Sequence, residues 1–326
     1  MLAHPSTDLY FRHALDHHIS RWWRPGPIVR RGANCFAIGR WLVLIRQDSE
    51  AVMRLALGWP GPLAYVVDDD IAGAAASPGL PADYRRRLAR FDAVFHRPLL
   101  ARAQALLVPS GALAARFAAD PAIGAAIHRI EPCWHLPPAD QAHFADLAHG
   151  APLRIAHLGT ASHAGALAAL APVLASVLAG RHDLHFTYVA PAPLAGLPLH
   201  NTRHLLPQRW PRYRRWLARQ RFHLALYPLE ANPFDRARSA SKLTEHAITG
   251  AAGLYPANWA PARRLGTGAL LAPAHPADWG VALAGAIAHR QALANIATKA
   301  AATLACQAPC AVQQSVWMRI LDHPFA

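Results

Sequence analysis

The sequence has few cysteine, lysine and acidic residues. Four cysteines among 326 residues are too few for a disulfide-built scaffold, and their spacing completes no zinc site, so we expect all four to be reduced. The 33 basic residues outnumber the 19 acidic ones, which makes the formal net charge +14. Almost all of the basic residues are arginines in a sequence that is also rich in alanine and proline. We therefore attribute the charge to genomic composition rather than to a nucleic-acid partner.

Long hydrophobic runs are also missing. The longest apolar segment, 164–180, is mostly alanine, contains Pro172 and is shorter than the roughly 20 residues that a membrane-spanning helix needs. The first 24 residues carry charged side chains throughout and lack the apolar core of a signal peptide. We therefore expect a soluble, cytoplasmic protein.

The length and the 53% hydrophobic content favour two domains with sizeable cores. Short runs of Val, Ile and Leu alternate with longer segments of Ala, Leu and Arg, a pattern typical of parallel sheets covered by helices. The predicted strands are 41–45, 63–67, 105–108, 127–131, 153–158, 184–189, 223–227, 253–255 and 269–271. The predicted division is 1–145 for the first domain, 146–310 for the second and 311–326 for a closing helix.

A strand-to-helix turn at Gly159-Thr160 is the first candidate binding element. A glycine there lets the backbone approach a ligand, and the free N–H groups that open the next helix favour a phosphate. His163 lies just inside the turn, where it can contact a transferred sugar or a phosphate oxygen. The alternative is an ordinary turn with a capping threonine and a locally packed histidine.

The segment 229–250, which follows the predicted strand 223–227, is the second candidate. Arg238, Ser239 and Lys242 lie within about one helical turn, and Glu245 follows Lys242 by three residues, so the last two can share a helix face. Two cations and a hydroxyl can hold a diphosphate while the carboxylate accepts hydrogen bonds from a ribose. The alternative is a solvated helix start in which Lys242 and Glu245 form an ordinary surface ion pair.

The run 233–250 resembles the motif P-F-N-x-x-K-S-x-x-K-x-x-E-Y-x-x-x-G of bacterial GT-B glycosyltransferases that use nucleotide sugars, with every spacing matched. The turn at Gly159, Thr160 and His163 is similar to the strand-G-T-x-x-H turn of the same family. The resemblance covers about residues 150–310. It implies an α/β protein of GT-B type with two Rossmann-like lobes on parallel sheets, the N-terminal lobe being shortened.

The sequence departs from the family motif at Asp235, Arg238 and His246, where the family has Asn, Lys and an aromatic residue. Members with an E-x7-E pattern have an acidic residue eight positions before the glutamate, where this sequence has Ala237. The resemblance therefore leaves the retaining or inverting outcome open.

Three acidic residues, 68–70, follow the predicted strand 63–67, at the sheet edge where open α/β sheets bind ligands. Asp69 or Asp70 can serve as a general base or orient an acceptor hydroxyl. Adjacent charges repel one another and cannot all face one site, so at least one of the three is expected to be a loop or helix-capping residue.

The resemblance implies transfer of a sugar from a nucleotide diphosphate sugar to an acceptor hydroxyl, in surface polysaccharide or glycan biosynthesis. It assigns the donor to Gly159, Thr160, Arg238, Ser239, Lys242 and Glu245. The acceptor would be a glycan or a lipid-linked glycan. No Cys/His ligand spacing points to a metal, and cations with a helix N-terminus can neutralise the diphosphate without an obligatory metal or other cofactor.

Two other classes of function stay open. One is a non-catalytic nucleotide-sugar-binding or scaffold protein that keeps the donor lobe. The other is nucleic-acid binding, which the charge suggests and its genomic explanation disfavours.

Two basic segments, 85–87 and 209–221, bear on where in the cell the protein is located. Aromatic residues are interleaved with the arginines of 209–221, which we interpret as an amphipathic helix, with contact to an anionic membrane as the alternative. The latter would place the protein peripherally on the inner face of the cytoplasmic membrane.

Overall fold

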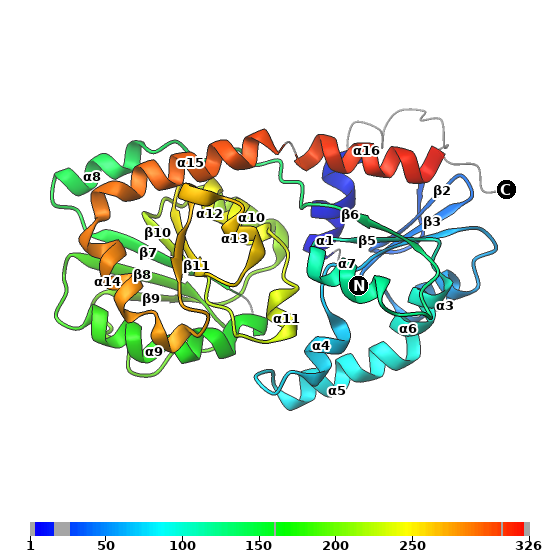
Figure 1. Ribbon diagram of the computed structural model, residues 1–326, viewed down its shortest axis with the longest axis horizontal. Coiled ribbons are helices and arrows are strands. Elements are labelled where there is room, and N and C mark those ends of the chain that lie inside the picture. The colour runs from blue at the N-terminus through cyan, green and yellow to red at the C-terminus, as the bar shows by residue number, and fades with distance from the viewer. Residues whose placement is uncertain (1–3, 16–26, 160, 308, 323–326) are drawn as a thin grey trace. The chain divides into compact units, whose positions relative to one another are not determined.

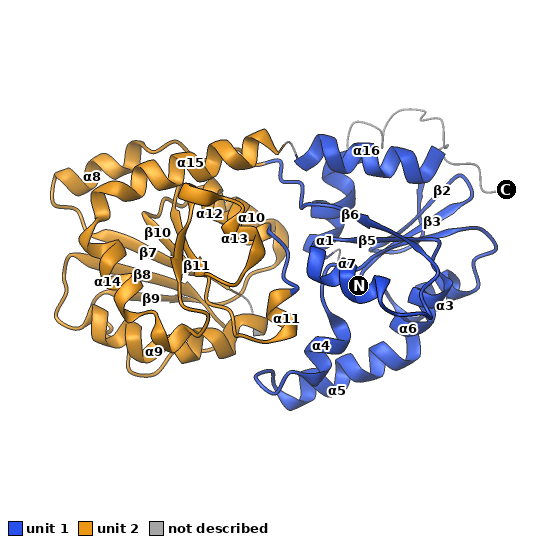
Figure 2. Ribbon diagram, in the orientation of Figure 1, with its two compact units in different colours: residues 1–135, 237–240, 308–326 blue, residues 136–236, 241–307 orange. Residues whose placement is uncertain are grey.

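The computed structural model describes residues 4–15, 27–159, 161–307 and 309–322 (Figure 1). The chain forms two compact units (Figure 2). Unit 1 consists of residues 1–135, 237–240 and 308–326, and unit 2 of residues 136–236 and 241–307. The C-terminal helix therefore belongs to unit 1.

Unit 1 contains a six-stranded sheet in the order β1-β2-β3-β4-β5-β6. Its strands are β1 (Ile28–Arg30), β2 (Cys35–Ile38), β3 (Trp41–Ile45), β4 (Leu63–Val66), β5 (Ala105–Val108) and β6 (Ala126–Arg129). The parallel strands β3 to β6 confirm the four strands predicted in this part of the sequence. Strands β1 and β2 are antiparallel additions that were not predicted: β1 pairs with β2, and β2 pairs with β3. The sheet is therefore mixed rather than wholly parallel.

Helices cover both faces of this sheet (Figure 1). The helices are α1 (Pro5–Thr7), η1 (Asp8–Arg12), α3 (Glu50–Leu57), α4 (Ile71–Ala76), α5 (Ala82–Phe91), η2 (Asp92–His96), α6 (Arg97–Arg102), α7 (Gly111–Ala118) and α16 (Pro309–Asp322). On one face, α3, α6 and α7 pack on Leu42, Leu44 and Leu106. On the other, Phe11 of η1 stacks on Phe36 of β2 and meets the Trp317 ring of α16 edge-on.

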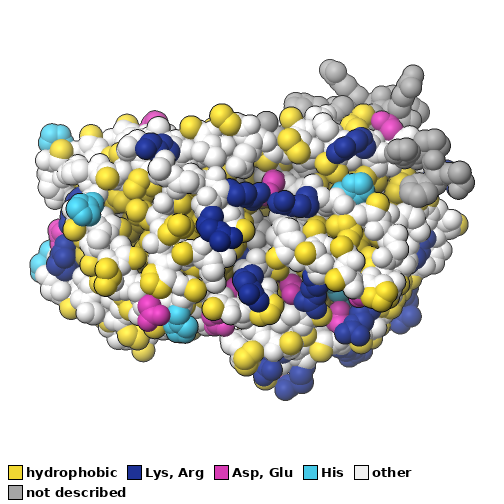
Figure 3. All heavy atoms as spheres, in the orientation of Figure 1, with side chains coloured by type: hydrophobic (Ala, Val, Ile, Leu, Met, Phe, Trp, Pro, Cys, Tyr) yellow, Lys and Arg dark blue, Asp and Glu magenta, His cyan; other side chains and the backbone are white. Residues whose placement is uncertain are grey.

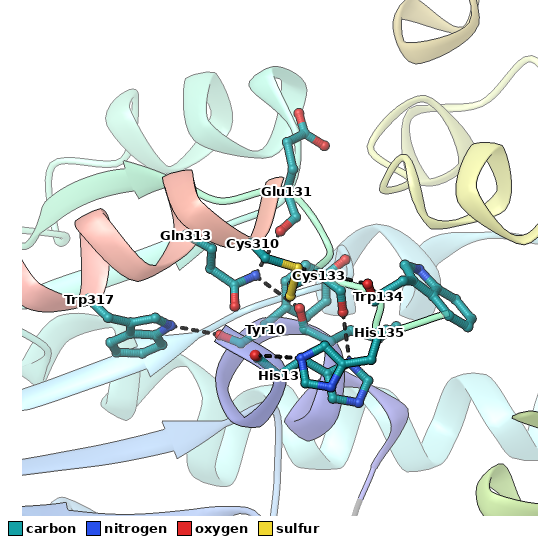
Figure 4. Close-up of a disulfide and its surroundings, with 10 residues drawn as sticks. Tyr10, His13, Glu131, Cys133, Trp134, His135, Cys310, Gln313 and Trp317 are labelled. Atoms are coloured by element: carbon teal, nitrogen blue, oxygen red, sulfur yellow. Dashed lines mark hydrogen bonds between the residues drawn. A yellow bond between two sulfur atoms is a disulfide. The ribbon is translucent and has the colours of Figure 1, made fainter. Parts of the chain in front are cut away.

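Helix α16 is fastened to unit 1 by a disulfide and by hydrogen bonds (Figure 4). The Trp317 indole donates to the carbonyl of Tyr10 at 2.8 Å, and the Gln313 amide donates to the carbonyls of Leu9 and Glu131 at 2.9 and 2.7 Å. The apolar face predicted for this helix is buried: Val316, Trp317, Ile320 and Leu321.

The expectation that all cysteines are reduced is wrong. Cys133 and Cys310 form a disulfide, whereas Cys35 and Cys306 are free. The two bonded residues are 177 positions apart, so their spacing gives no sign that the fold brings them together. Only the docking of α16 beside the segment after β6 does so.

Unit 2 contains a parallel six-stranded sheet in the order β12-β11-β10-β7-β8-β9. Its strands are β7 (Leu153–Leu158), β8 (Leu184–Val189), β9 (Thr202–Leu205), β10 (Leu224–Leu226), β11 (Ala252–Pro256) and β12 (Leu270–Ala272). Five of them confirm predicted strands. Strand β9 was missed because its sequence, Thr-Arg-His-Leu, is polar and lies at an exposed edge.

The helices of unit 2 pack on both faces of its sheet. They are η3 (Ala142–Phe144), α8 (Ala145–Ala148), η4 (Ala161–His163), α9 (Ala164–Leu178), α10 (Trp210–Leu217), α11 (Pro233–Arg236), α12 (Ser241–Ile248), α13 (Ala260–Arg263), η5 (Gly266–Gly268), η6 (Pro276–Asp278), α14 (Gly280–Ala288), η7 (Arg290–Ala292) and α15 (Leu293–Cys306). Helix α9 is formed by the alanine-rich segment and contains Pro172. No helix in the described ranges is both long enough and apolar enough to cross a bilayer.

The two basic segments lie on helices. In Figure 3, Lys and Arg side chains gather along the lower edge of unit 1, where α5 exposes Arg86, Arg87 and Arg90. Helix α10 of unit 2 exposes Arg212 and Arg215, whereas its aromatic residues are partly buried. The predicted amphipathic helix is thus confirmed, and contact with a membrane stays a prediction.

Candidate functional site

The strand order of unit 2 reverses between β7 and β10. From β7 the chain proceeds to β8 and β9 on one side, and from β10 to β11 and β12 on the other. Open α/β sheets bind ligands at the carboxyl ends of the strands at such a reversal. Gly159 follows β7 here and Tyr227 follows β10. In the described strands of unit 1, by contrast, the order follows the chain without a reversal.

Two of the predicted site residues, Gly159 and His163, lie at this point. The His163 ring is buried and meets the Tyr227 ring edge-on, with centroids 5.2 Å apart. A Cβ atom on Gly159 would overlap the imidazole of His157, so the glycine is required by this close approach of a side chain. Thr160, predicted to bind the donor with Gly159, lies outside the described residues.

His157 was not singled out from the sequence. It is buried in β7, and its Nδ1 lies 3.2 Å from the carbonyl oxygen of Leu226, the last residue of β10. Burial, and to a smaller extent the charge of Lys242, lower the pKa of His157 to about 4, although the Leu226 contact opposes this shift. The imidazole is therefore neutral at pH 7, and it lies between the Gly159 turn and helix α12.

Helix α12 places Lys242 and Glu245 in one buried cluster. The Lys242 Nζ donates to Oε2 of Glu245 at 2.7 Å, and the Tyr213 hydroxyl of α10 donates to the same oxygen at 2.5 Å. The side chains of Lys242 and Glu245 are only 11% and 7% exposed. The alternative of an ordinary surface ion pair is therefore wrong, because both charges are withdrawn from water.

His246 and Tyr255 form a second pair of buried polar groups in unit 2. The Nδ1 of His246 and the hydroxyl of Tyr255 are 2.8 Å apart, and both residues are buried. Burial, followed by the nearby charge of Lys242, holds the pKa of His246 well below its usual value. A Cβ atom on Gly253 would overlap the Tyr255 ring, so this glycine leaves room for the ring across β11.

The structure places Arg238 and Ser239 in unit 1 and Lys242 and Glu245 in unit 2. The Arg238 guanidinium is 3.4 Å from both carboxylate oxygens of Asp69, and the Arg46 guanidinium is 3.5 Å from Asp69. Ser239 hydrogen-bonds the hydroxyl of Tyr10. Arg238 and Ser239 thus have protein partners within unit 1.

The three acidic residues after β4 have different surroundings. Asp70 accepts a hydrogen bond from the backbone N–H of Gly73 at 2.8 Å, which caps α4, and it pairs with Arg116. Asp68 pairs with Arg46 at 3.3 Å and accepts a hydrogen bond from Ser6. Burial raises the pKa of Asp69, and the charges of Arg238 and Arg46 only partly oppose it. Asp70 is therefore a capping residue of the kind that the sequence led us to expect, whereas Asp69 is a buried carboxylate paired with Arg46 and Arg238, and its catalytic role stays a prediction.

Arg46 adds an unpredicted feature to this edge of unit 1. Its φ of 59° is in the left-handed region, which non-glycine residues rarely adopt. Its carbonyl accepts a hydrogen bond from the Tyr65 hydroxyl at 2.9 Å, and its N–H donates to the carbonyl of Val66 at 2.9 Å. These bonds hold the strained backbone, and the side chain in turn faces Asp68 and Asp69.

Metal ligands are not grouped in the part of the chain that the structure describes. Nowhere there do three His, Cys, Asp or Glu residues lie as a metal ion would need. The independence from metal that the resemblance implies stays a prediction.

Comparison with protein-family models and with curated proteins finds no match to this chain. Solved structures do match. TarM matches with a TM-score of 0.58 and 9% identity, over 86% of this chain and 54% of TarM. HepE of Anabaena, in complex with UDP and glucose, matches with a TM-score of 0.56 and 13% identity, over 86% of this chain and 78% of HepE.

An α,α-trehalose 6-phosphate synthase of Burkholderia multivorans matches with a TM-score of 0.54 and 12% identity, over 86% of this chain and 70% of the synthase. These neighbours are glycosyltransferases of GT-B fold. At such low identities the likeness concerns the fold alone. The chain therefore has the GT-B fold, with Rossmann-like units built on predominantly parallel sheets.

Proposed function

We propose that this chain is a glycosyltransferase that binds a nucleotide diphosphate sugar at the carboxyl edge of the unit 2 sheet. The observation that supports this most is the buried Lys242–Glu245 pair on α12, which lies between β10 and β11 in the chain, β10 being one of the two strands at the reversal of strand order. The GT-B fold adds support, as does the neighbour HepE, whose structure contains UDP and glucose.

The donor roles follow from the chemistry of these side chains. An ammonium group has three N–H donors, and Glu245 accepts only one from Lys242, so the others can bind a phosphate oxygen. The Glu245 carboxylate accepts hydrogen bonds from the ribose hydroxyls. Gly159 and His163 contact the sugar and the diphosphate, whereas the donor roles expected for Thr160, Arg238 and Ser239 stay predictions.

The proposed reaction breaks the bond between the sugar C1 and the diphosphate oxygen and forms a bond from C1 to the acceptor oxygen. The diphosphate leaves with the electron pair, and Lys242 stabilises its developing charge. The acceptor hydroxyl loses its proton to a carboxylate. Asp69 is our candidate for this base, because it is a buried carboxylate at the carboxyl end of β4 and burial raises its pKa.

The acceptor and the cellular setting rest on the family resemblance. We propose a glycan or lipid-linked acceptor in surface polysaccharide synthesis, at the inner face of the cytoplasmic membrane. No obligatory metal or other cofactor is part of this proposal.

Binding of nucleoside diphosphates measured by calorimetry tests the donor site. Lys242→Ala is expected to weaken the best-binding nucleoside diphosphate about 10- to 100-fold, the usual effect of losing charged hydrogen bonds. Lys299→Ala is a matched control, because this other lysine is exposed on α15. Equal affinities of the two variants would show that the donor site is misplaced.

A non-catalytic nucleotide-sugar-binding protein is the second candidate. It is favoured by one observation: Asp69 is already paired with Arg46 and Arg238, and Asp70 with Arg116 and the start of α4. Donor binding without release of the diphosphate, across a panel of glycan acceptors, would support this function over the first.

A further inference from the structure

The Glu245 carboxylate is held from one side only. Both of its donors, the Tyr213 hydroxyl and the Lys242 ammonium, bind the same oxygen, Oε2, at 2.5 and 2.7 Å. Among the contacts of the described residues, none is made by the other oxygen, Oε1. A carboxylate offers lone pairs on both oxygens, and polar atoms in buried positions normally have partners. This arrangement leaves Oε1 as the oxygen that can accept from a ligand.

The surroundings of Tyr213 maintain its hydrogen bond to Glu245. Its ring lies between those of Trp210 and Trp216 on the same helix, with centroids 6.2 and 5.8 Å away. Burial and the neighbouring Glu245 charge raise the pKa of Tyr213 well above its usual value. The phenol therefore stays protonated and donates to the carboxylate throughout the physiological pH range.

Lys242 alone does not fix the carboxylate. Its ammonium is on the same helix, at the end of a flexible side chain, and in the proposed function it also binds the diphosphate. The Tyr213 hydroxyl comes from a different helix, α10, and so donates to the carboxylate from a second, independent direction. Two donors on one oxygen define the plane and rotation of the carboxylate, which one donor leaves free.

We propose that Tyr213 is a positioning residue that holds Glu245 with Oε1 presented to the ribose, so that the site selects ribonucleotides over 2′-deoxyribonucleotides. This inference rests on the proposed donor site and adds to it the residue that sets the sugar preference. Tyr213 itself makes no contact with the reacting atoms.

The test measures the affinities of UDP, 2′-deoxy-UDP and pyrophosphate by calorimetry, with the GDP and ADP pairs run in parallel. We expect the wild-type protein to favour the ribonucleotide at least about tenfold, as for a hydrogen bond to a charged group. In Tyr213→Phe this ratio falls to about threefold or less, whereas the affinity for pyrophosphate changes less than about twofold. If Tyr213→Phe keeps the wild-type ratio, the inference is wrong.

Two further variants distinguish a positioning role of the Tyr213 hydroxyl from effects on ring packing and on folding. Trp216→Phe alters the packing around the Tyr213 ring without removing the hydroxyl and is expected to keep the ratio; a loss as large as in Tyr213→Phe would overturn the positioning role. If Tyr213→Phe does not fold, Glu245→Gln replaces it as the test variant. Tyr213 and Lys242 both donate to Oε2, so the glutamine places its oxygen there and its NH₂ group at the position of Oε1. The ribose then loses its acceptor, and the ratio of ribonucleotide to deoxyribonucleotide affinity should fall to the same extent. An unchanged ratio would again refute the inference.

The outcome also distinguishes this inference from the proposed function. If the wild-type protein binds no nucleoside diphosphate of the panel, the proposed donor site fails and the inference fails with it. If it binds them and prefers the ribonucleotide, only the role of Tyr213 remains to be decided by the variants.

Discussion

Reduction of the Cys133–Cys310 disulfide is expected to destabilise the protein strongly. The bond joins residues 177 positions apart, so it closes a long loop in the unfolded chain. Chain entropy for a loop of this length gives about 5 kcal/mol of stabilisation if the whole loop unfolds together. Most of that loop is unit 2. If unit 2 stays folded while unit 1 unfolds, fewer residues gain freedom and we expect about 2–3 kcal/mol.

The reduced protein should still fold, because α16 keeps its other contacts. The amide of Gln313 and the indole of Trp317 bind backbone carbonyls of the N-terminal helix, and the Trp317 side chain is fully buried. We therefore expect the urea midpoint of unit 1 to fall by about 1 M on reduction, for an ordinary dependence of unfolding free energy on urea. Tryptophan fluorescence with and without dithiothreitol measures this shift.

Cys306→Ser is the matched control for this experiment, because Cys306 is exposed and takes no part in the bond. Its urea midpoint and its response to reductant should equal those of the wild type, whereas Cys310→Ser should behave like the reduced protein. Thiol titration of the denatured, unreduced chain should count two free thiols. Four free thiols, or a midpoint that reduction leaves unchanged, would refute the reasoning.

Other perturbations test the buried groups of unit 2. Lys242→Met leaves the Glu245 carboxylate buried with Tyr213 and should lower the free energy of unfolding by about 3 kcal/mol, whereas Lys242→Met/Glu245→Leu should recover most of that loss in denaturant titrations. Gly253→Ala forces a Cβ atom against the Tyr255 ring and should cost about 1–3 kcal/mol, and Gly285→Ala, where nothing lies within 4 Å, should be neutral or stabilising; their melting temperatures compare the two. His157 has a pKa of about 4 when folded against 6.5 when unfolded, so between these values the unfolded chain binds more protons and stability is lost as the pH falls. From pH 7 to pH 5 this single group should lower the free energy of unfolding by about 2 kcal/mol, and in urea titrations over this range His157→Gln should flatten the decline, unlike the exposed-site variant His289→Gln.

Some features of this protein follow from local sequence alone. Strands β7 and β8 are short segments with Leu, Ile, Phe, Tyr and Val at most of their buried positions, and their predicted ranges equal the observed ones. The Lys242–Glu245 spacing places both residues on one face of α12, because the helical repeat brings residues three apart together. The GT-B fold also came from the sequence, through the resemblance of 233–250 to a family motif.

Other features required the tertiary structure, because they join residues that no local pattern relates. The hydroxyl of Tyr213 reaches Glu245 from 32 residues away, and Cys133 meets Cys310 across 177 residues. Strand β9 is polar and forms only because β8 offers it an edge with which to pair. Periodicity and spacing describe faces of helices and strands, but they carry no information on which faces meet. Local sequence therefore specified most of the parallel strands and the motif, whereas β9, the pairing of Glu245 with Tyr213, the disulfide and the burial of Asp69 between two arginines arose only when packing brought distant segments together.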